Sequence, residues 1–533
     1  MFRPARLAIA GHADEAQSGQ FAPAPRSAGP IVLRRFPSIL TNRARMALSF
    51  SEYRGLDAVA MAELVRSGQV TPAELLETAI ARAEAVNPVL NAICHPMYEA
   101  GRVDAAAAAL SAPLAGVPFL LKDITTHRRG WPMTSGSLVM RDQVSSFDSE
   151  VVKRYLAAGL VLFGRTTTPE FGYAASAESR LFGPTRNPWD LSRTAGGSSG
   201  GAAAAVAAGI VPAAQGGDAG GSIRIPASFS GLFGIKPTRA RVPAGPAHGA
   251  FLGFSTTHVL SRSVRDSALL LDVTHGPDTG APYAAPPPRR GFLAATRTRP
   301  KRLRIALQRR AFDDTPVDAD CIRAIEETAR LCEELGHEVI EADLRFDHGR
   351  LREIYFVVWP MLVMHSLDQH ARATGRPVRM EELETYVARL VDGARRASAG
   401  DFIAGLESMT EVSRLFRAQS DAFDLVLSPT TAQVAPQIGV LDPSNPDQDQ
   451  LDAALAASVA FTQIHNVTGQ PAASIPLYWT EQGIPVGSQF AARFGDEETI
   501  FALAAQLEEA RPWFGRAADL SVPDARDDAS HGD

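Results

Sequence analysis

The stretch GGSSGGAAAAVAAGIVPAAQGGDAGGSIRIPASFSGLFGIKPT, residues 196–238, carries most of the information about the fold of this chain. Glycines and serines gather at two places in it, and alanines fill the space between them. The pattern predicts an alanine-rich helix over 200–208, a strand over 210–216 and a second glycine turn over 216–221.

The two serine-bearing turns are expected to lie close together. The predicted helix spans roughly 14 Å and the strand that returns spans roughly 17 Å. Ser198 or Ser199 and Ser222 can therefore meet at one end of a sheet. Glycines beside Ser222 free several backbone N–H groups to point at one place, and serines beside such groups suit acyl transfer. The residue types alone favour tight turns and a crowded contact between helix and sheet over a catalytic role.

Other catalytic patterns fit the sequence poorly. GGSSG, residues 196–200, matches the G-x-S-x-G nucleophile elbow, but such a match means little in a run so rich in these residues. The elbow also needs a downstream histidine, and His337 and His465 lie in no supporting motif. Phosphate-binding and dinucleotide-binding glycine patterns are absent from the sequence.

Strands and helices alternate on both sides of the opening stretch. GVPFLLKD (116–123), GLVLFGRT (159–166) and LRIALQ (303–308) are short apolar runs typical of buried strands. Thr71 begins a helix with proline and glutamate in its first turn, and a second helix is expected over 318–339. The alternation predicts the α/β class, with a large sheet between layers of helices.

Composition excludes several classes of protein. The 533 residues carry a net charge of −6, which offers no basic face for nucleic acid or an anionic membrane. The three cysteines form no metal-binding spacing, and no apolar run is long enough to span a bilayer. Of the 53 basic residues only four are lysines, and one of these, Lys122, lies among apolar residues beside Asp123.

The chain is expected to form a single domain over 46–516, with a helical, cap-like insertion over 350–420. The first 45 residues hold seven arginines and two acidic residues, and are expected to be a disordered tail or to follow from a start codon assigned too early. Residues 517–533 are polar and are expected to form a C-terminal tail.

Residues 195–238 closely resemble the signature of the amidase signature family. PLAGVPFLLKDITT resembles the strand that carries the family's catalytic lysine, and the resemblance covers roughly residues 50–515. The segment NVTGQPAASIPL and the residues after it resemble amidases of the 6-aminohexanoate-cyclic-dimer hydrolase type. The resemblance implies the fold of that family, a large mixed sheet sandwiched between helices with a helical cap region. Gly217 departs from the family, which often has threonine there, and we expect this to affect packing rather than chemistry.

The resemblance implies a catalytic triad of Ser222, Ser198 and Lys122. Ser222 is the implied nucleophile. Ser198, which follows a cis peptide bond in the family, relays the proton to Lys122. Arginine cannot serve as this base, because it does not lose its proton near neutral pH. Without the resemblance, Lys122 reads as a buried lysine paired with Asp123.

The remaining site residues follow from the same resemblance. The N–H groups of Ala219, Gly220, Gly221 and Ser222 are the implied oxyanion hole. Ser199, Asp218 and Arg224 are expected to support the site, the last two as braces of the loop. Lys236, His95 and His127 are expected to be structural, and the shape of the substrate to be set by residues 127–137 and the helices of 350–420.

The resemblance therefore implies a stand-alone cytoplasmic amidase that acts on a small or medium carboxamide and needs no metal or cofactor. Neither nucleic acid nor a membrane is expected as a partner, and a homodimer is consistent with the family. The alternatives are a hydrolase of cyclic or ω-amino-acid amides, the glutaminase subunit of a tRNA-dependent amidotransferase, and an inactive scaffold that uses the fold for binding.

Overall fold

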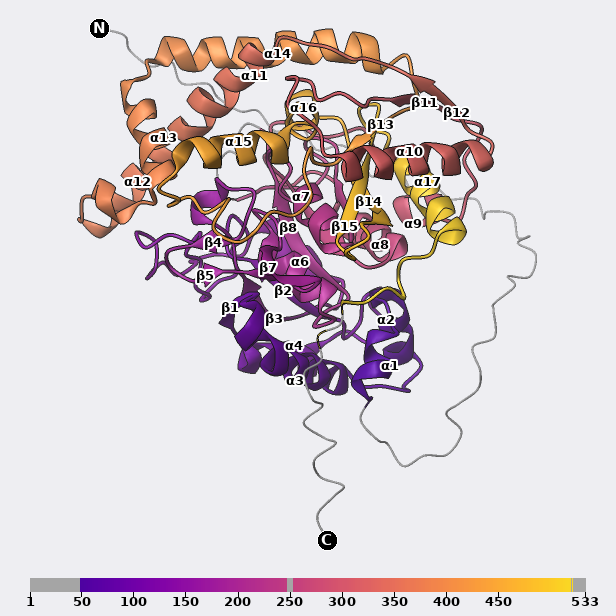
Figure 1. Ribbon diagram of the computed structural model, residues 1–533. Helices are drawn as coiled ribbons and strands as arrows, with labels where there is room; N and C mark the ends of the chain where they lie inside the picture. The colour runs from indigo at the N-terminus through magenta and orange to yellow at the C-terminus, as the bar shows by residue number, and fades with distance from the viewer. Residues whose placement is uncertain (1–47, 247–252, 519, 521–533) are drawn as a thin grey trace, which may run out of the picture. The chain divides into compact units, whose positions relative to one another are not determined.

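The computed structural model describes residues 48–246, 253–518 and 520 of the chain (Figure 1). The tail predicted over 1–45, and nearly all of the tail predicted over 517–533, lie outside these residues.

An eight-stranded sheet forms the centre of the fold. Among its strands, β11 runs parallel to both neighbours and every other pair is antiparallel, so the sheet is mixed, as predicted. The strands closest to the chain's C-terminus, β14 and β15, lie in the middle of the sheet and not at an edge. In spatial order the strands are β12 (Glu338–Glu341), β11 (Arg304–Leu307), β13 (Leu425–Pro429), β15 (Pro485–Ala492), β14 (Ala472–Trp479), β9 (Phe233–Lys236), β10 (Thr256–Ser261) and β8 (Ala213–Asp218).

A smaller sheet holds the strands predicted around Lys122. Its order is β1 (Ile93–Pro96), β3 (Val161–Thr166) and β2 (Pro118–Lys122), with β2 and β3 parallel. Every residue of β2 and β3 is buried, as their apolar runs predicted. Two short ribbons follow along the chain: β4 (Glu178–Ser179) with β5 (Gly183–Pro184), and β6 (Arg186–Asn187) with β7 (Asp190–Thr194).

The helix predicted within the opening stretch is present, whereas the strand after it is shifted. Helix α6 spans Gly200–Ala207. Strand β8 begins at Ala213, because the preceding Pro212 has no N–H for a ladder, and it continues to Asp218 by pairing with β10. Gly216 and Gly217 therefore lie in the strand, and the turn that was predicted to start at residue 216 follows Asp218.

Helix α6 explains why the stretch is so rich in glycine and alanine. All eight of its residues are buried, and it contacts β2, β3 and β8. A Cβ on Gly201 would lie 2.3 Å from Oγ1 of Thr167, so only glycine permits this close approach. The small residues thus let one helix hold both sheets together at the ends that carry Lys122 and Asp218.

Other helices cover the two sheets (Figure 1). The predicted start of the helix at Thr71 is confirmed, since Thr71 and Glu74 form a capping box at the first turn of α3. The helix predicted over 318–339 ends at Glu334, and the last two residues of the predicted range, 338 and 339, belong to strand β12. Besides α6, the helices described before residue 340 are α1 (Phe50–Arg54), α2 (Ala58–Arg66), α3 (Pro72–Leu90), α4 (Tyr98–Ala107), α5 (Glu150–Ala157), a 3₁₀ turn at Glu170–Gly172, α7 (Arg224–Ser230), α8 (Val264–Thr274), α9 (Phe292–Ala295) and α10 (Ala319–Glu334).

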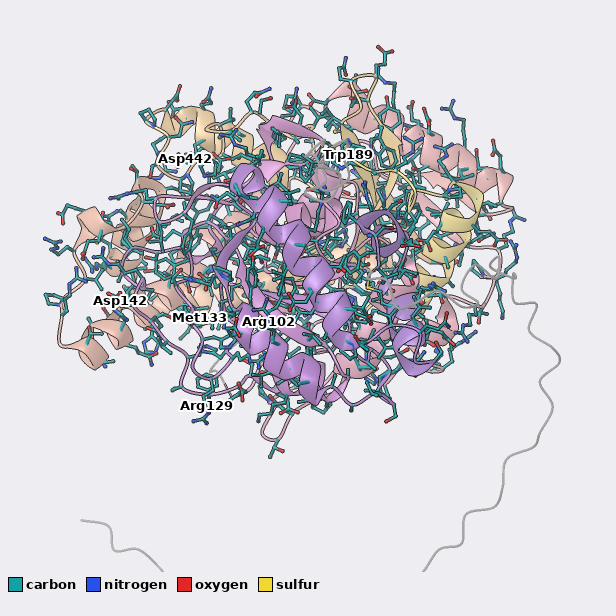
Figure 2. All side chains as sticks on the ribbon, turned by 90° about the horizontal axis from the view of Figure 1, so that it is seen from below. Arg102, Arg129, Met133, Asp142, Trp189 and Asp442 are labelled. Carbon is teal, nitrogen blue, oxygen red and sulfur yellow. The ribbon has the colours of Figure 1, made fainter. Side chains whose placement is uncertain are left out.

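Charged side chains lie at the outer surface of the helices. Figure 2 labels Arg102 of α4, whose Nε donates a hydrogen bond to Oε1 of Glu77 in α3 (2.7 Å). Both side chains are about half exposed. An exposed pair of this kind contributes little to the stability of the fold.

Residues 350–420 are mostly helical, as predicted, and the bounds of the single domain, 46–516, stay a prediction. None of the helices in the described part of the chain is long and apolar enough to cross a membrane. The helices after residue 340 are α11 (His348–Glu353), a π-helical turn at Ile354–Val358, α12 (Trp359–Thr374), a 3₁₀ turn at Met380–Glu382, α13 (Thr385–Arg396), α14 (Ala399–Ser420), α15 (Gln448–Val459), α16 (Gln463–Thr468) and α17 (Glu497–Ala510).

Candidate active site

Lys122 ends strand β2 and is enclosed by the protein. Only 2% of the residue is exposed. Its backbone N–H donates a hydrogen bond to Oε1 of Gln215 in β8 (2.7 Å), which connects the small sheet to the large one. Its Nζ lies 2.7 Å from Oγ of Ser198 and 3.0 Å from Oγ of Ser199. The structure therefore brings the predicted lysine to both predicted serines.

The environment of Lys122 favours its neutral form. Burial lowers the pKa of Lys122 from its usual 10.5 to about 7, although the carboxylate of Asp218 opposes the shift. The adjacent carboxylate of Asp123 is engaged elsewhere, because it accepts hydrogen bonds from the N–H (3.0 Å) and Oγ1 (2.5 Å) of Thr134. Lys122 is thus not paired with Asp123. Near neutral pH, the Lys122 side chain is therefore uncharged in a large fraction of the molecules and can accept a proton.

The turn that carries Ser198 and Ser199 is fixed by its backbone. The peptide bond between Gly197 and Ser198 is cis, as the resemblance implies. A Cβ on Gly197 would lie 2.0 Å from the carbonyl oxygen of Ser176, so glycine is required there. The N–H of Ser199 donates to the carbonyl oxygen of Ser222 (3.2 Å), and this bond joins the two serine-bearing turns.

Ser199 has a second role, in holding the end of β8. Its Oγ donates to the carbonyl oxygen of Gly217 and accepts from the N–H of the same residue, both at 3.3 Å. A Cβ on Gly217 would have no neighbour closer than 4.0 Å, so nothing in the packing requires glycine at this departure from the family. Gly217 contacts Ser199 through its backbone alone, and the expected effect of this departure on packing stays a prediction.

Residues 218–222 form a tight turn that presents Ser222 to a cavity. Gly221 has a φ of +131°, and a Cβ there would lie 2.6 Å from Oγ1 of Thr462. The carbonyl oxygen of Gly220 accepts a hydrogen bond from the same Oγ1 (2.6 Å), and that of Ala219 accepts one from the hydroxyl of Tyr355 (2.9 Å). Contacts from the C-terminal half of the chain thus fix the carbonyls of the turn.

The predicted oxyanion donors differ in what they contact. The N–H of Gly221 donates to Oδ1 of Asp218 (2.8 Å), so it is already engaged. Among the described residues, no acceptor contacts the N–H of Ala219, Gly220 or Ser222. Of these three residues, Gly220 and Ser222 line the cavity.

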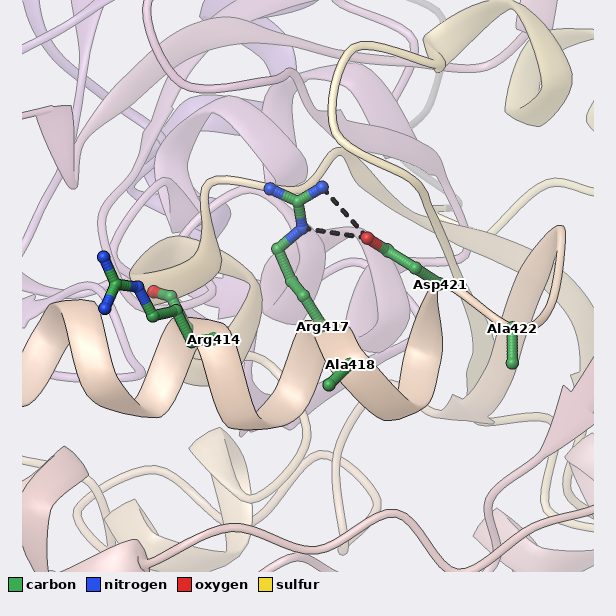
Figure 3. A pocket seen from close by; sticks show the side chains of 6 residues that line it. Arg414, Arg417, Ala418, Asp421 and Ala422 are labelled. Carbon is green, nitrogen blue, oxygen red and sulfur yellow. Dashed lines mark hydrogen bonds and ion pairs between the residues drawn. The ribbon is translucent and has the colours of Figure 1, made fainter.

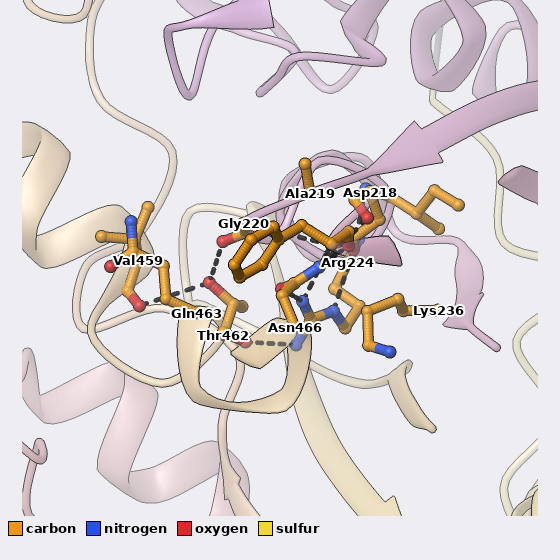
Figure 4. Close-up of polar contacts among 12 residues, drawn as sticks. Asp218, Ala219, Gly220, Arg224, Lys236, Val459, Thr462, Gln463 and Asn466 are labelled. Atoms are coloured by element: carbon orange, nitrogen blue, oxygen red, sulfur yellow. Dashed lines mark hydrogen bonds and ion pairs between the residues drawn. The ribbon is translucent and has the colours of Figure 1, made fainter. Parts of the chain in front are cut away.

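Asp218 and Arg224 form a buried clamp beneath the turn, which matches their expected role as braces (Figure 4). The guanidinium donates from Nε to Oδ2 and from Nη2 to Oδ1, both at 2.9 Å, and neither side chain is exposed. Burial alone raises the pKa of Asp218, but the charge and hydrogen bonds of Arg224 outweigh it and hold that pKa well below its usual range. The carboxylate therefore stays charged and accepts the N–H groups of Gly221 and Ile223.

The sequence analysis did not identify two further residues that hold the turn, Asn466 and Thr462. Nδ2 of Asn466 donates to Oδ1 (2.9 Å) and to the backbone oxygen (3.0 Å) of Asp218, and Nη2 of Arg224 donates to Oδ1 of Asn466 (2.6 Å). Thr462 precedes α16 and contacts the turn as described above. Asn466 opens the segment NVTGQPAASIPL, so the resemblance of that segment was the available signal for it.

The cavity at Ser222 has a volume of about 230 Å³ and lies between the turn and the cap helices. Residues of 350–420, which were expected to shape the substrate site, line this cavity, whereas none of residues 127–137 does. Its wall is mainly apolar, formed by small, aliphatic and aromatic residues, with a few charged groups. The lining side chains and glycines are those of Gly172, Tyr173, Ala174, Ala175, Gly197, Gly220, Ser222, Ile225, Asp313, His348, Arg352, Tyr355, Phe356, Trp359, Tyr386, Leu390, Asp452, Leu455, Ala456, Val459 and Gln463.

Two other hollows lie outside this cavity. One of about 660 Å³ is lined by residues 124–127, by parts of 133–151 and 242–257, by Phe171 and by α12, and it shares no lining residue with the Ser222 cavity. The other is an open hollow on α14, where the guanidinium of Arg417 contacts the carboxylate of Asp421 at 3.0 Å (Figure 3). It shares no lining residue with the Ser222 cavity.

Lys236 lies outside the Ser222 cavity, and its Nζ donates to the carbonyl oxygen of Pro237 (2.8 Å). Burial, together with the charge of Arg224, lowers the pKa of Lys236 to about 7. His127 lines the 660 Å³ hollow and stacks on Phe147, so it also lies away from Ser222.

One group of side chains in the described part of the chain has ligand atoms close enough for a metal ion. Atoms of Cys94, His95 and Asp123 lie within 4.8 Å of one another. Burial and the charge of Asp123 raise the pKa of the Cys94 thiol, so this ligand stays protonated. The buried guanidinium of Arg165 also acts on both Cys94 and Asp123. A cation would therefore face a protonated thiol and a buried positive charge, and we assign no metal to this group.

Comparison with known proteins places the chain among amide hydrolases. A family model described as Amidase matches residues 74–501. The chain is 37% identical over 484 residues to 6-aminohexanoate-cyclic-dimer hydrolase of Paenarthrobacter ureafaciens, which covers 88% of this chain and 97% of that protein. It is 38% identical over 470 residues to the putative amidase AmiC of Mycobacterium tuberculosis (strain ATCC 25618 / H37Rv), with 86% and 95% covered. The solved structure of 6-aminohexanoate cyclic dimer hydrolase superposes with a TM-score of 0.83 at 35% identity, over 87% of this chain and 99% of that one.

Proposed function

The chain belongs to the amidase signature family and is an amidase that acts on non-peptide C–N bonds, and we propose that it does so through an acyl-enzyme on Ser222. One observation carries the assignment of residues. A buried lysine with a pKa of about 7 lies 2.7 Å from Oγ of Ser198, and the turn after Ser198 is hydrogen-bonded to Ser222.

In the first half of the proposed reaction, Oγ of Ser222 attacks the carbonyl carbon of the amide. Ser198 takes the proton of Ser222 while it passes its own proton to Nζ of Lys122, so Lys122 becomes an ammonium group. The C–N bond then breaks. The nitrogen of the leaving amine takes a proton from Ser198, which is restored from Lys122, and the acyl group stays on Ser222 as an ester.

In the second half, water attacks the ester and the same relay runs again. Lys122 accepts a proton from the water through Ser198, and Ser222 recovers its proton when the ester bond breaks. The products are a carboxylate and an amine or ammonia. Every proton transfer uses a group of the chain itself, so the proposed reaction requires no metal or cofactor.

The negative charge that develops on the carbonyl oxygen needs hydrogen-bond donors. We assign this role to the free N–H groups of Ala219, Gly220 and Ser222. Removing one such donor typically raises the barrier by about 3–4 kcal/mol. Gly221 instead shapes the turn, because its N–H is bonded to Asp218. Asp218 and Arg224 act beneath the turn as positioning residues.

We propose a small or medium carboxamide as the substrate. The mostly apolar wall of the cavity suits the apolar part of such a molecule. The similarity to 6-aminohexanoate-cyclic-dimer hydrolase supports cyclic or linear ω-amino-acid amides as the more specific proposal. A cytoplasmic location and a homodimer stay predictions, for fractionation of cells and size-exclusion chromatography to test.

Purified protein should release amine or ammonia from members of a panel of aliphatic, aryl, cyclic and peptide C-terminal amides. A fluorophosphonate probe should label the wild type and fail to label Ser222→Ala. Lys122→Ala should lose turnover, whereas Ser67→Ala, which changes an exposed serine at the end of α2, serves as the matched control.

Absence of both turnover and labelling in the wild type would contradict the proposal. It would favour the alternative that the protein is an inactive scaffold that uses the fold for binding. Activity that appears only after a partner chain is added would instead favour the amidotransferase subunit.

A further inference from the structure

Tyr173 lines the Ser222 cavity with a hydroxyl that has no hydrogen-bond partner among the described residues. The residue is 8% exposed, so the hydroxyl is largely removed from water. Two other buried tyrosines are satisfied: Tyr53 donates to the carbonyl oxygen of Ile210 and Tyr355 to that of Ala219, both at 2.9 Å. A buried hydroxyl without a partner costs free energy, and such a group in a cavity wall points to a ligand.

The position of Tyr173 ties it to the reacting groups. The preceding residue, Gly172, has a φ of +75°, and a Cβ there would lie 3.2 Å from Oγ of Ser198. Residues 172–173 therefore lie against the proposed relay. The ring of Tyr173 is held by the indole of Trp359, with ring centroids 4.9 Å apart. The ring of Tyr173 is thus held in the wall of the cavity that Ser222 also lines.

The other polar groups of the wall are mostly engaged. The carboxylate of Asp313 lies 3.6 Å from Nε2 of His348, and that of Asp452 lies 2.5 Å from Nη2 of Arg389. Burial raises the pKa of Tyr173 well above 10, so its hydroxyl stays protonated at neutral pH and can donate a hydrogen bond. A neutral acceptor on the substrate, such as a carbonyl oxygen, is the matching chemistry.

From this geometry we propose that Tyr173 is a specificity-determining residue that donates a hydrogen bond to a second carbonyl group of the substrate, separate from the amide that is cleaved. The inference rests on the proposed function. It narrows the substrate to carboxamides that carry another amide or carbonyl group on the same chain. Amides with a purely hydrocarbon chain leave the hydroxyl unpaired and bind less well.

Binding to a Ser222→Ala background tests this without turnover. Hexanamide and its diamide counterpart, adipamide, are the matched ligands. Calorimetry or ligand-observed NMR should show that adding Tyr173→Phe weakens adipamide about tenfold and changes hexanamide less than about twofold, because one hydrogen bond is lost. Adding Tyr53→Phe instead removes a buried, bonded hydroxyl outside the cavity and should leave the ratio of the two affinities unchanged.

An unchanged ratio in the Tyr173→Phe protein, equal weakening of both ligands, or no binding of adipamide at all would overturn the proposal. In the otherwise wild-type enzyme, Tyr173→Phe should raise KM for adipamide more than it lowers kcat. If the wild type neither turns over amides nor reacts with the fluorophosphonate probe, but the affinity ratio shifts as described, the proposed function fails and the assignment of Tyr173 stands.

Discussion

Replacing Lys122 with arginine should keep a positive charge and remove the base. With a pKa of about 7, about half of Lys122 is neutral at pH 7. The pKa of arginine exceeds 12, so its neutral fraction at pH 7 is below about 10⁻⁵. A positioned general base contributes roughly 10²–10⁴ to the rate. We therefore expect kcat of Lys122→Arg to fall by about 10² to 10⁴.

The assay is steady-state release of amine between pH 5 and 9. Because only neutral Lys122 accepts a proton, kcat/KM of the wild type should rise about tenfold per pH unit below the pKa of Lys122 and level off above it, near pH 7. Lys122→Met, which has a similar length and no charge, should be as inactive as Lys122→Arg. Thermal unfolding of all three proteins shows whether each variant is folded.

Two results would refute the role of a neutral lysine. The first is more than about a tenth of wild-type kcat in folded Lys122→Arg, since a guanidinium cannot act as the base. The second is a wild-type profile of kcat/KM that stays flat from pH 5 to 9, since it would show that the protonation of Lys122 does not control the rate.

Four further substitutions test the site, the turn that supports it and a buried ion pair elsewhere in the fold. Ser198→Ala removes the proposed relay and should lower kcat by at least about 10²-fold. Ser199→Ala removes bonds to β8 but not the proposed relay, and should lower kcat about tenfold or less. Equal losses of kcat in steady-state assays would contradict the assignment of Ser198, rather than Ser199, as the relay. Thr462→Val keeps the shape and removes one buried hydrogen bond, so chemical denaturation should show a loss of about 1–3 kcal/mol together with a lower kcat; an unchanged kcat would show that the turn holds without it. Arg241→Met leaves the carboxylate of Glu497 buried and unpaired, and should lower the free energy of unfolding by about 3–5 kcal/mol with kcat unchanged in the folded fraction; a loss below about 1 kcal/mol would contradict this.

The local parts of the site were predictable because the residues that form each of them lie close together in the sequence. The alanine-rich helix, the buried strand ending at Lys122 and the serines of residues 196–238 follow from period, glycine placement and resemblance. The start of β8 was missed by three residues, because Pro212 removes a ladder donor and the pairing with β10 carries the strand past its glycines.

The non-local parts of the site were not predictable in this way. Nothing in the sequence around Gly221 says that its N–H is taken by Asp218, because this depends on how the turn closes. Thr462 and Asn466 reach the turn from far along the chain, and no periodic pattern connects them to it. The unpaired hydroxyl of Tyr173 likewise appears only once the cap helices enclose the cavity.

The clamp beneath the nucleophile sets a condition on when the enzyme becomes active during its synthesis. The turn of residues 218–222 is held by Thr462 and Asn466, and the middle of the sheet is filled by β14 and β15, which leave the ribosome last among the strands. A nascent chain that ends before Asn466 carries all three residues of the proposed triad, Lys122, Ser198 and Ser222, but it lacks the contacts that shape the turn. Such long-range closure also makes folding slow. We therefore expect hydrolytic activity to arise only once the polypeptide is nearly finished, and stalled chains to remain unreactive toward serine-directed probes.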